Sequence, residues 1–146
     1  MKVLSLWHPY AALAVYGFKR YETRPKAAPS TMKIGDRFGI ASTKQIKTEQ
    51  EACAEHPRLQ RHYRDTGLPN WKDLPRGCII GTVVLGESIK ITTDMVMNLE
   101  EPEYVYGDWR IGRYAWPLSD PVLLKNPVPA RGQQGIWEID DNLIES

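Results

Sequence analysis

The most apolar stretch of the chain is Cys78–Leu85, which follows a turn-forming glycine, Gly77. Such a near-continuous apolar run predicts a strand that is buried on both faces. Other segments with strand character are short and bounded by glycine or proline: Lys2–Leu6, Arg37–Ser42, Arg113–Leu118, Val122–Leu124 and Ile136–Ile139. Because these strands do not alternate regularly with helices, we expect an α+β fold. About five or six strands would form a small curved sheet or barrel with peripheral helices.

Helical patterns are confined to a few places. Tyr10–Gly17 has the spacing of a two-turn helix that ends at Gly17. The polar segment 45–67 is predicted to be a helical insertion with two pieces, Thr48–Glu55 and Pro57–Thr66, in which Thr48 and Glu51 form a capping box. Thr92–Glu101 has weaker helical character and is expected to end before Pro102. With 146 residues, the chain fits a single domain, residues 1–146, that buries roughly two-thirds of its unfolded surface.

Composition excludes several classes of protein. Lys and Arg number 19 against 18 Asp and Glu, so any site for nucleic acid has to be a local patch. The two cysteines, Cys53 and Cys78, form no CxxC pair, and His56 and His62 lack metal-ligand spacing, so we expect neither a disulfide framework nor a metal. None of the motifs GxGxxG, GxxxxGK[ST], HExxH and GxSxG occurs. No cofactor and no protein partner are inferred.

The N-terminal apolar run is too short for a signal peptide, and no run approaches the length that crosses a bilayer. We therefore expect a reduced, cytoplasmic protein that has no contact with a membrane.

Charged residues gather directly after Gly17, where Lys19, Arg20, Glu22 and Arg24 lie within six positions. If 19–24 is one strand, Glu22 and Arg24 share a face and Lys19 points to the other side. If the strand begins only at Glu22, Lys19 lies on the turn and can approach the glutamate. This pattern has two interpretations. The segment is a charged edge that binds a ligand or takes part in catalysis, or it is a solvated edge strand with an internal ion pair.

Two segments, Leu6–Ala11 and Gly17–Arg24, the second with the pattern G-x-K-x-x-E-x-R, resemble the opening of ASCH domains. One departure is His8, which stands where many members have glutamine before the proline. Further segments agree in order along nearly the whole chain: Ile40–Ser42, Arg76–Gly81, Glu103–Gly107 leading into Gly112–Trp116, and Pro127–Gly135. The resemblance implies a PUA-like fold, a small β-barrel with helices around a cleft, and an association with RNA or modified nucleosides.

Members of this family include RNA-binding modules, ribonucleases of single strands and amidohydrolases of N4-acetylcytidine. By position, Lys19 matches the family's catalytic lysine, whereas Glu22 stands where the small amidohydrolases have a threonine nucleophile. Thr23 is adjacent but faces the other way on a strand. Glu103 is the candidate for a second acid.

Glu22 decides between two mechanisms. If it pairs with Arg24, Lys19 is free to activate water, with Glu103 passing the proton to the leaving amine. If it pairs with Lys19, the lysine stays charged and binds a phosphate or carbonyl group.

Base recognition is assigned to aromatic and polar residues. Trp7, Tyr114 and Trp116 are candidates for stacking a base, although Tyr114 and Trp116 equally suit the core. Ser42 and Gln134 suit hydrogen bonding to a base edge or the capping of loops. Tyr10, Arg24 and Arg131, which lie in matching segments, complete the expected substrate-binding set.

The resulting hypothesis is a hydrolase of an N4-acylated cytidine or of single-stranded RNA. Its rival is a non-catalytic RNA-binding module. In a third case, the charged strand only closes the barrel through ion pairs.

Overall fold

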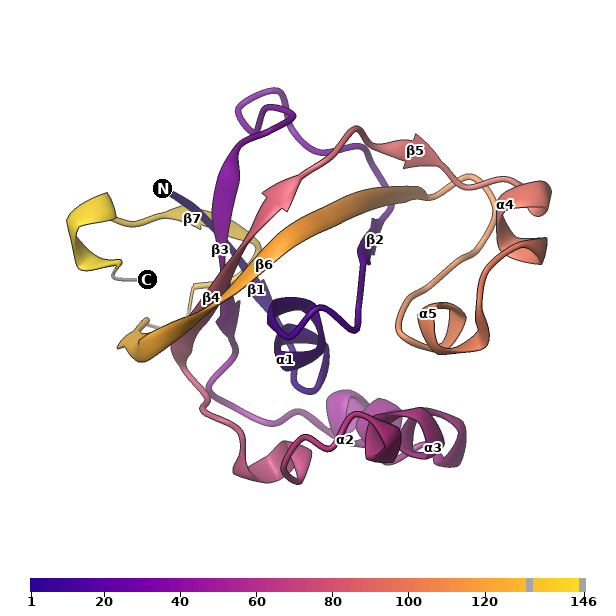
Figure 1. Cartoon of the computed structure of the whole chain (residues 1–146), viewed down its shortest axis with the longest axis horizontal. Coiled ribbons are helices and arrows are strands. Elements are labelled where there is room, and N and C mark those ends of the chain that lie inside the picture. The colour runs from indigo at the N-terminus through magenta and orange to yellow at the C-terminus, as the bar shows by residue number, and fades with distance from the viewer. Residues whose placement is uncertain (131–132, 145–146) are drawn as a thin grey trace.

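The computed structural model describes residues 1–130 and 133–144, which form a curled, mixed sheet with helices packed around it (Figure 1). The sheet has seven strands in the order β2-β6-β4-β3-β1-β7, with β5 paired to β6. The strands are β1 Lys2–Leu6, β2 Tyr21–Arg24, β3 Arg37–Ser42, β4 Cys78–Leu85, β5 Ile89–Lys90, β6 Tyr114–Pro129 and β7 Ile136–Glu138. The predicted α+β fold with a small curved sheet and peripheral helices is confirmed.

The first helix, α1, is Tyr10–Val15, and it packs on the sheet against β3, β4 and β6. Residues 11–15 are all buried, as expected for a helix that fills the concave side of a curled sheet. Gly81 in β4 permits this approach, because a Cβ atom there would lie 2.6 Å from Val15 Cβ and 2.7 Å from the carbonyl oxygen of Val122. β4 itself is buried almost throughout, as its apolar run indicated.

Two strands pair in parallel, which matters for the site. β1 runs parallel to β3, with Leu6 opposite Ser42, so both strands end at the same edge of the sheet. All other strand pairs are antiparallel. The residues that follow β1 and β3 are therefore brought side by side, and the amide of Thr43 donates to the carbonyl of Leu6 at 3.1 Å.

The strand β6 is longer than predicted. Arg113–Leu118 and Val122–Leu124 were expected to be two separate strands, but this prediction was wrong, because β6 runs without interruption from Tyr114 to Pro129. Asp120 adopts a positive φ of 46°, and Arg37 Nη1 donates to its carbonyl at 3.0 Å. Residues 114–117 of β6 pair with β2 and β5, and residues from 118 onward pair with β4.

The remaining helices are α2 Thr48–Ala54, α3 Pro57–Asp65, α4 Thr93–Met97 and α5 Glu101–Val105. The helical insertion is present as α2 and α3, and α3 packs against α5. Two local predictions were wrong. The N-cap of α2 is Lys47, whose amide donates to Gln50 Oε1, rather than Thr48 with Glu51. Pro102 lies in the first turn of α5 instead of ending a helix, because proline lacks only an N–H that has no partner there.

The charged strand also begins later than 19–24, since β2 starts at Tyr21. Lys19 is thus on the connection from α1. Among the residues described, no helix has both the length and the apolar character that a bilayer span requires.

Candidate functional site

The site is built around Lys19, which the end of α1 places. Gly17 adopts a φ of 84°, and the amides of Phe18 and Lys19 both donate to the carbonyl of Leu13 at 2.9 Å, so the chain turns back over its own helix. The Lys19 side chain is only 2 % exposed. Its Nζ donates to the carbonyl of Tyr21 at 2.5 Å and to that of Tyr106 at 2.9 Å. This ammonium ties β2 to the segment that follows α5.

Glu22 is shared between two cations. Its Oε1 lies 3.6 Å from Lys19 Nζ, and its Oε2 accepts from Arg24 Nε at 2.7 Å. Glu22 is 6 % exposed, whereas the Arg24 side chain is 32 % exposed and extends to the surface. Neither of the two predicted pairings holds alone, because the carboxylate contacts both partners.

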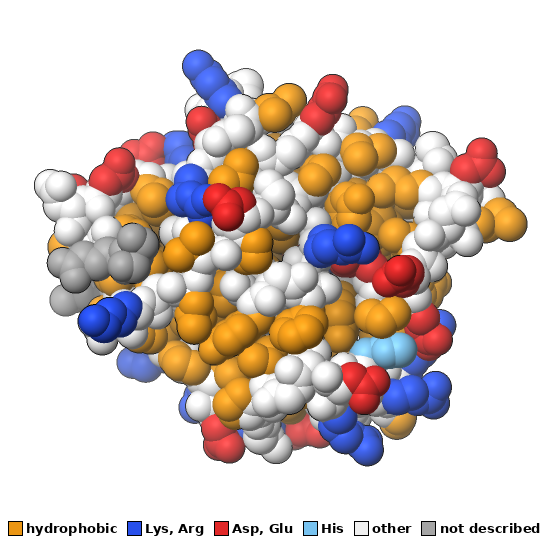
Figure 2. Space-filling view, viewed as in Figure 1, with side chains coloured by type: hydrophobic (Ala, Val, Ile, Leu, Met, Phe, Trp, Pro, Cys, Tyr) orange, Lys and Arg blue, Asp and Glu red, His pale blue; other side chains and the backbone are white. Residues whose placement is uncertain are grey.

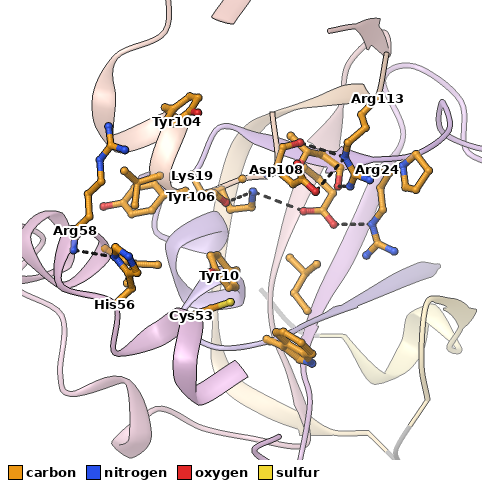
Figure 3. A pocket seen from close by; sticks show the side chains of 18 of the residues that line it. Tyr10, Lys19, Arg24, Cys53, His56, Arg58, Tyr104, Tyr106, Asp108 and Arg113 are labelled. Atoms are coloured by element: carbon orange, nitrogen blue, oxygen red, sulfur yellow. Dashed lines mark hydrogen bonds and ion pairs between the residues drawn. The ribbon is translucent and has the colours of Figure 1, made fainter. Parts of the chain in front are cut away.

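These three side chains line a cavity of about 800 Å³, which we call the first cavity. Its walls come from the end of β1, from β2, from the junction of α2 and α3, and from α5 with the loop that follows it (Figure 3). Seen from the same side as Figure 1, the surface of the molecule has charged side chains scattered among apolar ones (Figure 2). A volume of this size is typical of pockets for small organic ligands.

Arginine side chains lie at two sides of the first cavity. Arg58 Nε donates to Glu101 Oε1 at 2.8 Å, and its guanidinium lies 5.4 Å from the ring centre of Tyr104. Arg113 Nε donates to the carbonyl of Asp108 at 3.2 Å. The pKa of Asp108 is lowered, chiefly by the side-chain hydrogen bond from Arg110. Burial opposes this, and the Arg110 amide and the charges of Arg113 and Arg110 each lower the pKa by less.

Two tyrosines of the cavity keep their protons well above neutral pH. Burial raises the pKa of Tyr10, and the neighbouring Cys53 raises it further (Figure 3). Burial also raises the pKa of Tyr106 to about 12, helped by the charge of Glu103. Both hydroxyls can therefore donate a hydrogen bond to a ligand.

Glu103 does not line the first cavity, although the sequence suggested it as the second acid. It is 4 % exposed, its Oε1 accepts from the amide of Arg20 at 2.9 Å, and its Oε2 has no partner among the described residues. Burial raises the pKa of Glu103, opposed by the Arg20 amide and by the charges of Lys19 and Arg20. The bond from the Arg20 amide links α5 to the connection that carries Lys19.

The two aromatic residues of β6 are also placed outside the first cavity. Trp116 is 3 % exposed, belongs to the main core and donates from Nε1 to the carbonyl of Lys26 at 3.0 Å. Tyr114 is partly buried and packs against the same core. Trp7 and Tyr10, by contrast, line the cavity.

Ser42 and Gln134 line a different hollow of about 470 Å³, the second cavity, at the edge where β1 and β3 end. Ser42 Oγ donates to the carbonyl of Pro75 at 2.7 Å. Trp7 and Ser5 border both cavities. Arg131 lies outside the described residues.

Sequence patterns missed part of the site. Tyr104, Tyr106, Asp108 and Arg113 all line the first cavity. The signal available was the crowding of aromatic residues around Gly107, where a Cβ atom would lie 2.9 Å from Trp109 Nε1. In the part of the chain that the structure describes, no three His, Cys, Asp or Glu side chains are grouped so that they could hold a metal ion.

Comparisons with known proteins agree with this architecture. The ASCH protein from Zymomonas mobilis covers 97 % of this chain with a TM-score of 0.59 and 16 % identity, over 89 % of its own chain. A point mutant of the same protein covers 97 % with a TM-score of 0.57, over 91 % of its own chain. The chain has the ASCH fold. The resemblance to ASCH domains indicated by the sequence is confirmed at this level.

Curated sequences give a second, independent match. Activating signal cointegrator 1 from Mus musculus is 28 % identical, and its Homo sapiens counterpart is 26 % identical, each over 96 % of this chain. The ASCH fold described here spans only 22 % of the length of these relatives. No family model matches the chain.

Proposed function

We propose that this chain binds RNA or a modified pyrimidine nucleoside in the first cavity and hydrolyses it, with an N4-acylated cytidine as the preferred substrate. The observation that carries the proposal is the buried contact of Lys19 with Glu22, flanked by Arg24, in the wall of a cavity of nucleoside size. Buried charges are costly unless they are paired, so a charged group lining a cavity is a candidate for chemistry. The ASCH fold adds support for a nucleic-acid ligand.

The surroundings of Lys19 favour one of the two predicted roles. A lysine ammonium has three N–H donors, and two of them here donate to the carbonyls of Tyr21 and Tyr106. Glu22 Oε1, 3.6 Å from Nζ, lies beyond hydrogen-bond distance, so the third N–H is left to donate to a substrate oxygen. This arrangement suits a charged donor better than a neutral amine that accepts a proton. We therefore assign Lys19 to binding and polarising a carbonyl or phosphate oxygen of the substrate.

Glu22 is then the group that handles protons. In hydrolysis of an N4-acyl group, the oxygen of water bonds to the acyl carbon and the C–N bond breaks, which releases a carboxylic acid and the free amine of cytidine. Glu22 takes a proton from the water and returns it to the leaving nitrogen. Lys19 donates to the acyl oxygen as negative charge develops there. Glu103 stays in a supporting role, because it does not face the cavity.

Two other functions remain candidates, each supported by one observation. Hydrolysis of single-stranded RNA would use Arg24, which is partly exposed beside Glu22, to bind a phosphate group. A binding module without chemistry would explain why two of the Lys19 N–H groups are bonded to backbone carbonyls, which suits a structural role.

The test incubates the purified chain with N4-acetylcytidine and with labelled single-stranded RNA and follows products by chromatography. Lys19→Met and Glu22→Gln should each lower turnover by about 100-fold or more, the size expected for losing an oxyanion donor or a general base. Lys33→Met, in an exposed turn, is the matched control. Saturable binding without turnover would identify a binding module. The absence of both binding and turnover would refute the proposal.

A further inference from the structure

The second cavity has the composition of a nucleotide-binding surface. It is lined by two tryptophans, Trp7 and Trp137, and by several amide-bearing residues, Gln45, Gln133 and Gln134. The charged residues in its lining are both lysines, Lys44 and Lys47, and no acidic side chain joins them within the described part of the chain. This combination of cationic and aromatic groups suits a strand of phosphates and bases.

Both lysines are available to a ligand. Lys44 and Lys47 are exposed, and neither forms an ion pair with any residue that the structure describes. The backbone of Gly77 passes close to Lys44, since a Cβ atom added at Gly77 would lie 3.1 Å from Lys44 Cβ. Arg76 Nη1 also donates to the Lys44 carbonyl at 3.1 Å. The backbone that carries this cation is therefore held in place.

The tryptophans are presented at defined angles. Trp137 Nε1 donates to Ser5 Oγ at 2.9 Å, and Ser5 Oγ donates in turn to the carbonyl of Gln133 at 2.8 Å. Trp7 directly follows β1 and is partly exposed, and its indole N–H has no partner among the described residues. Each ring keeps part of its surface free for stacking.

The two cavities adjoin, since Ser5 and Trp7 line both of them. This follows from the parallel pairing of β1 with β3, which brings the ends of both strands to one edge of the sheet. A chain of nucleotides bound in the first cavity can leave past Trp7 toward Lys44 and Lys47.

We propose that the second cavity binds the nucleotide adjacent to the one held in the first cavity, so that the modified cytidine is bound as part of a single-stranded RNA segment rather than as a free nucleoside. Trp7 and Trp137 stack on its base, and the two lysines neutralise its phosphates. This inference rests on the proposed function of the first cavity.

The experiment compares the affinity of the chain for cytidine monophosphate, a dinucleotide and a tetranucleotide of single-stranded RNA. We expect affinity to rise about tenfold or more from one nucleotide to four. The double variant Lys44→Gln/Lys47→Gln should abolish most of that gain and leave mononucleotide binding unchanged. Its matched control is Lys33→Gln/Lys125→Gln, which removes two exposed lysines that line neither cavity.

Salt dependence gives a second readout. The slope of log affinity against log salt for the tetranucleotide should become shallower by about 1.4 in the double variant, or about 0.7 for each lost phosphate contact. A flat length series, or equal effects of the two double variants, would overturn the inference. So would equal competition by poly-glutamate, which would indicate an acidic protein partner instead. Turnover of N4-acetylcytidine with a flat length series would leave the proposed function intact, whereas no binding of any nucleotide would refute both.

Discussion

Lys19 Nζ lies 3.6 Å from Glu22 Oε1, although Lys19 precedes the strand that carries Glu22. The contact is possible because the chain turns at Gly17 and the Lys19 amide bonds back to Leu13, which directs the side chain under β2. Two charged groups therefore meet in a setting that almost completely excludes water.

Removing either member of this pair should reduce stability. Lys19→Met leaves the carbonyls of Tyr21 and Tyr106 without their donor, and we expect a loss of about 2–4 kcal/mol in the free energy of unfolding. In urea titrations, a double-mutant cycle with Glu22→Gln should show a coupling of about 0.5–3 kcal/mol. Strictly additive effects would mean that the two groups do not interact.

His8 should make the free energy of unfolding fall at acidic pH. His8 is 1 % exposed, and burial lowers its pKa to about 4, with the Arg76 charge contributing and a hydrogen bond between Nε2 and the Pro75 carbonyl opposing. In the unfolded chain the pKa returns to about 6.5. Because the folded pKa is the lower one, the stabilisation is fully present above about pH 6.5 and is lost as the pH falls toward 4.

The size of that effect is on the order of 3 kcal/mol, from the difference between the two pKa values. Urea unfolding at pH 7 and pH 4 should show this loss in the wild type and a smaller one in His8→Gln, whose amide can still donate to the Pro75 carbonyl. An identical pH dependence in both proteins would show that other groups cause the acid sensitivity.

Substitutions of the two tryptophans named as stacking candidates should have different effects, one on ligand binding and the other on stability. Trp7→Ala should weaken ligand binding by about 1–3 kcal/mol, the usual loss of a base-stacking contact. Trp116→Phe should lower stability by about 1–3 kcal/mol through its lost hydrogen bond and core volume, with affinity unchanged. Affinity is measured by fluorescence anisotropy and stability by thermal unfolding. If Trp116→Phe weakened binding while Trp7→Ala did not, Trp116 rather than Trp7 would be the residue that contacts the ligand.

The close approach of α1 to the sheet should be sensitive to one methyl group. Gly81→Ala places a Cβ atom within 2.6 Å of Val15 and 2.7 Å of the Val122 carbonyl, so we expect a loss of about 1–3 kcal/mol in stability. Adding Val15→Ala should recover only part of the loss, because the backbone oxygen of β6 remains. Full stability in Gly81→Ala would show that α1 can shift freely.

The pattern of apolar residues correctly predicted the strands that are buried along most of their length. β1, β3 and β4 have the predicted bounds, because apolar residues occupy most or all positions that face the core. β6 was divided in the prediction, because Asp120 and Pro121 resemble a turn and the contacts of Arg37 that hold the bend come from another strand. Local residue types cannot reveal support of that kind.

The candidate site shows the same limit. The pattern around Lys19 and Glu22 identified the charged residues and left two positions open for Lys19, because alternation could not show where the strand begins. The structure has Lys19 on the turn, beside Glu22. The inward direction of Glu103 depends on its bond from the Arg20 amide, and the burial of Trp116 depends on β6 crossing the core. Both are consequences of chain packing over long separations.

The amine of Lys19 fastens together two parts of the chain that are 87 positions apart. Such a buried amine reacts slowly with acylating reagents until its hydrogen bonds to the carbonyls of Tyr21 and Tyr106 break. The rate at which such a reagent labels Lys19, relative to its rate at exposed lysines, therefore measures how often this wall of the cavity opens locally. The measurement requires no ligand.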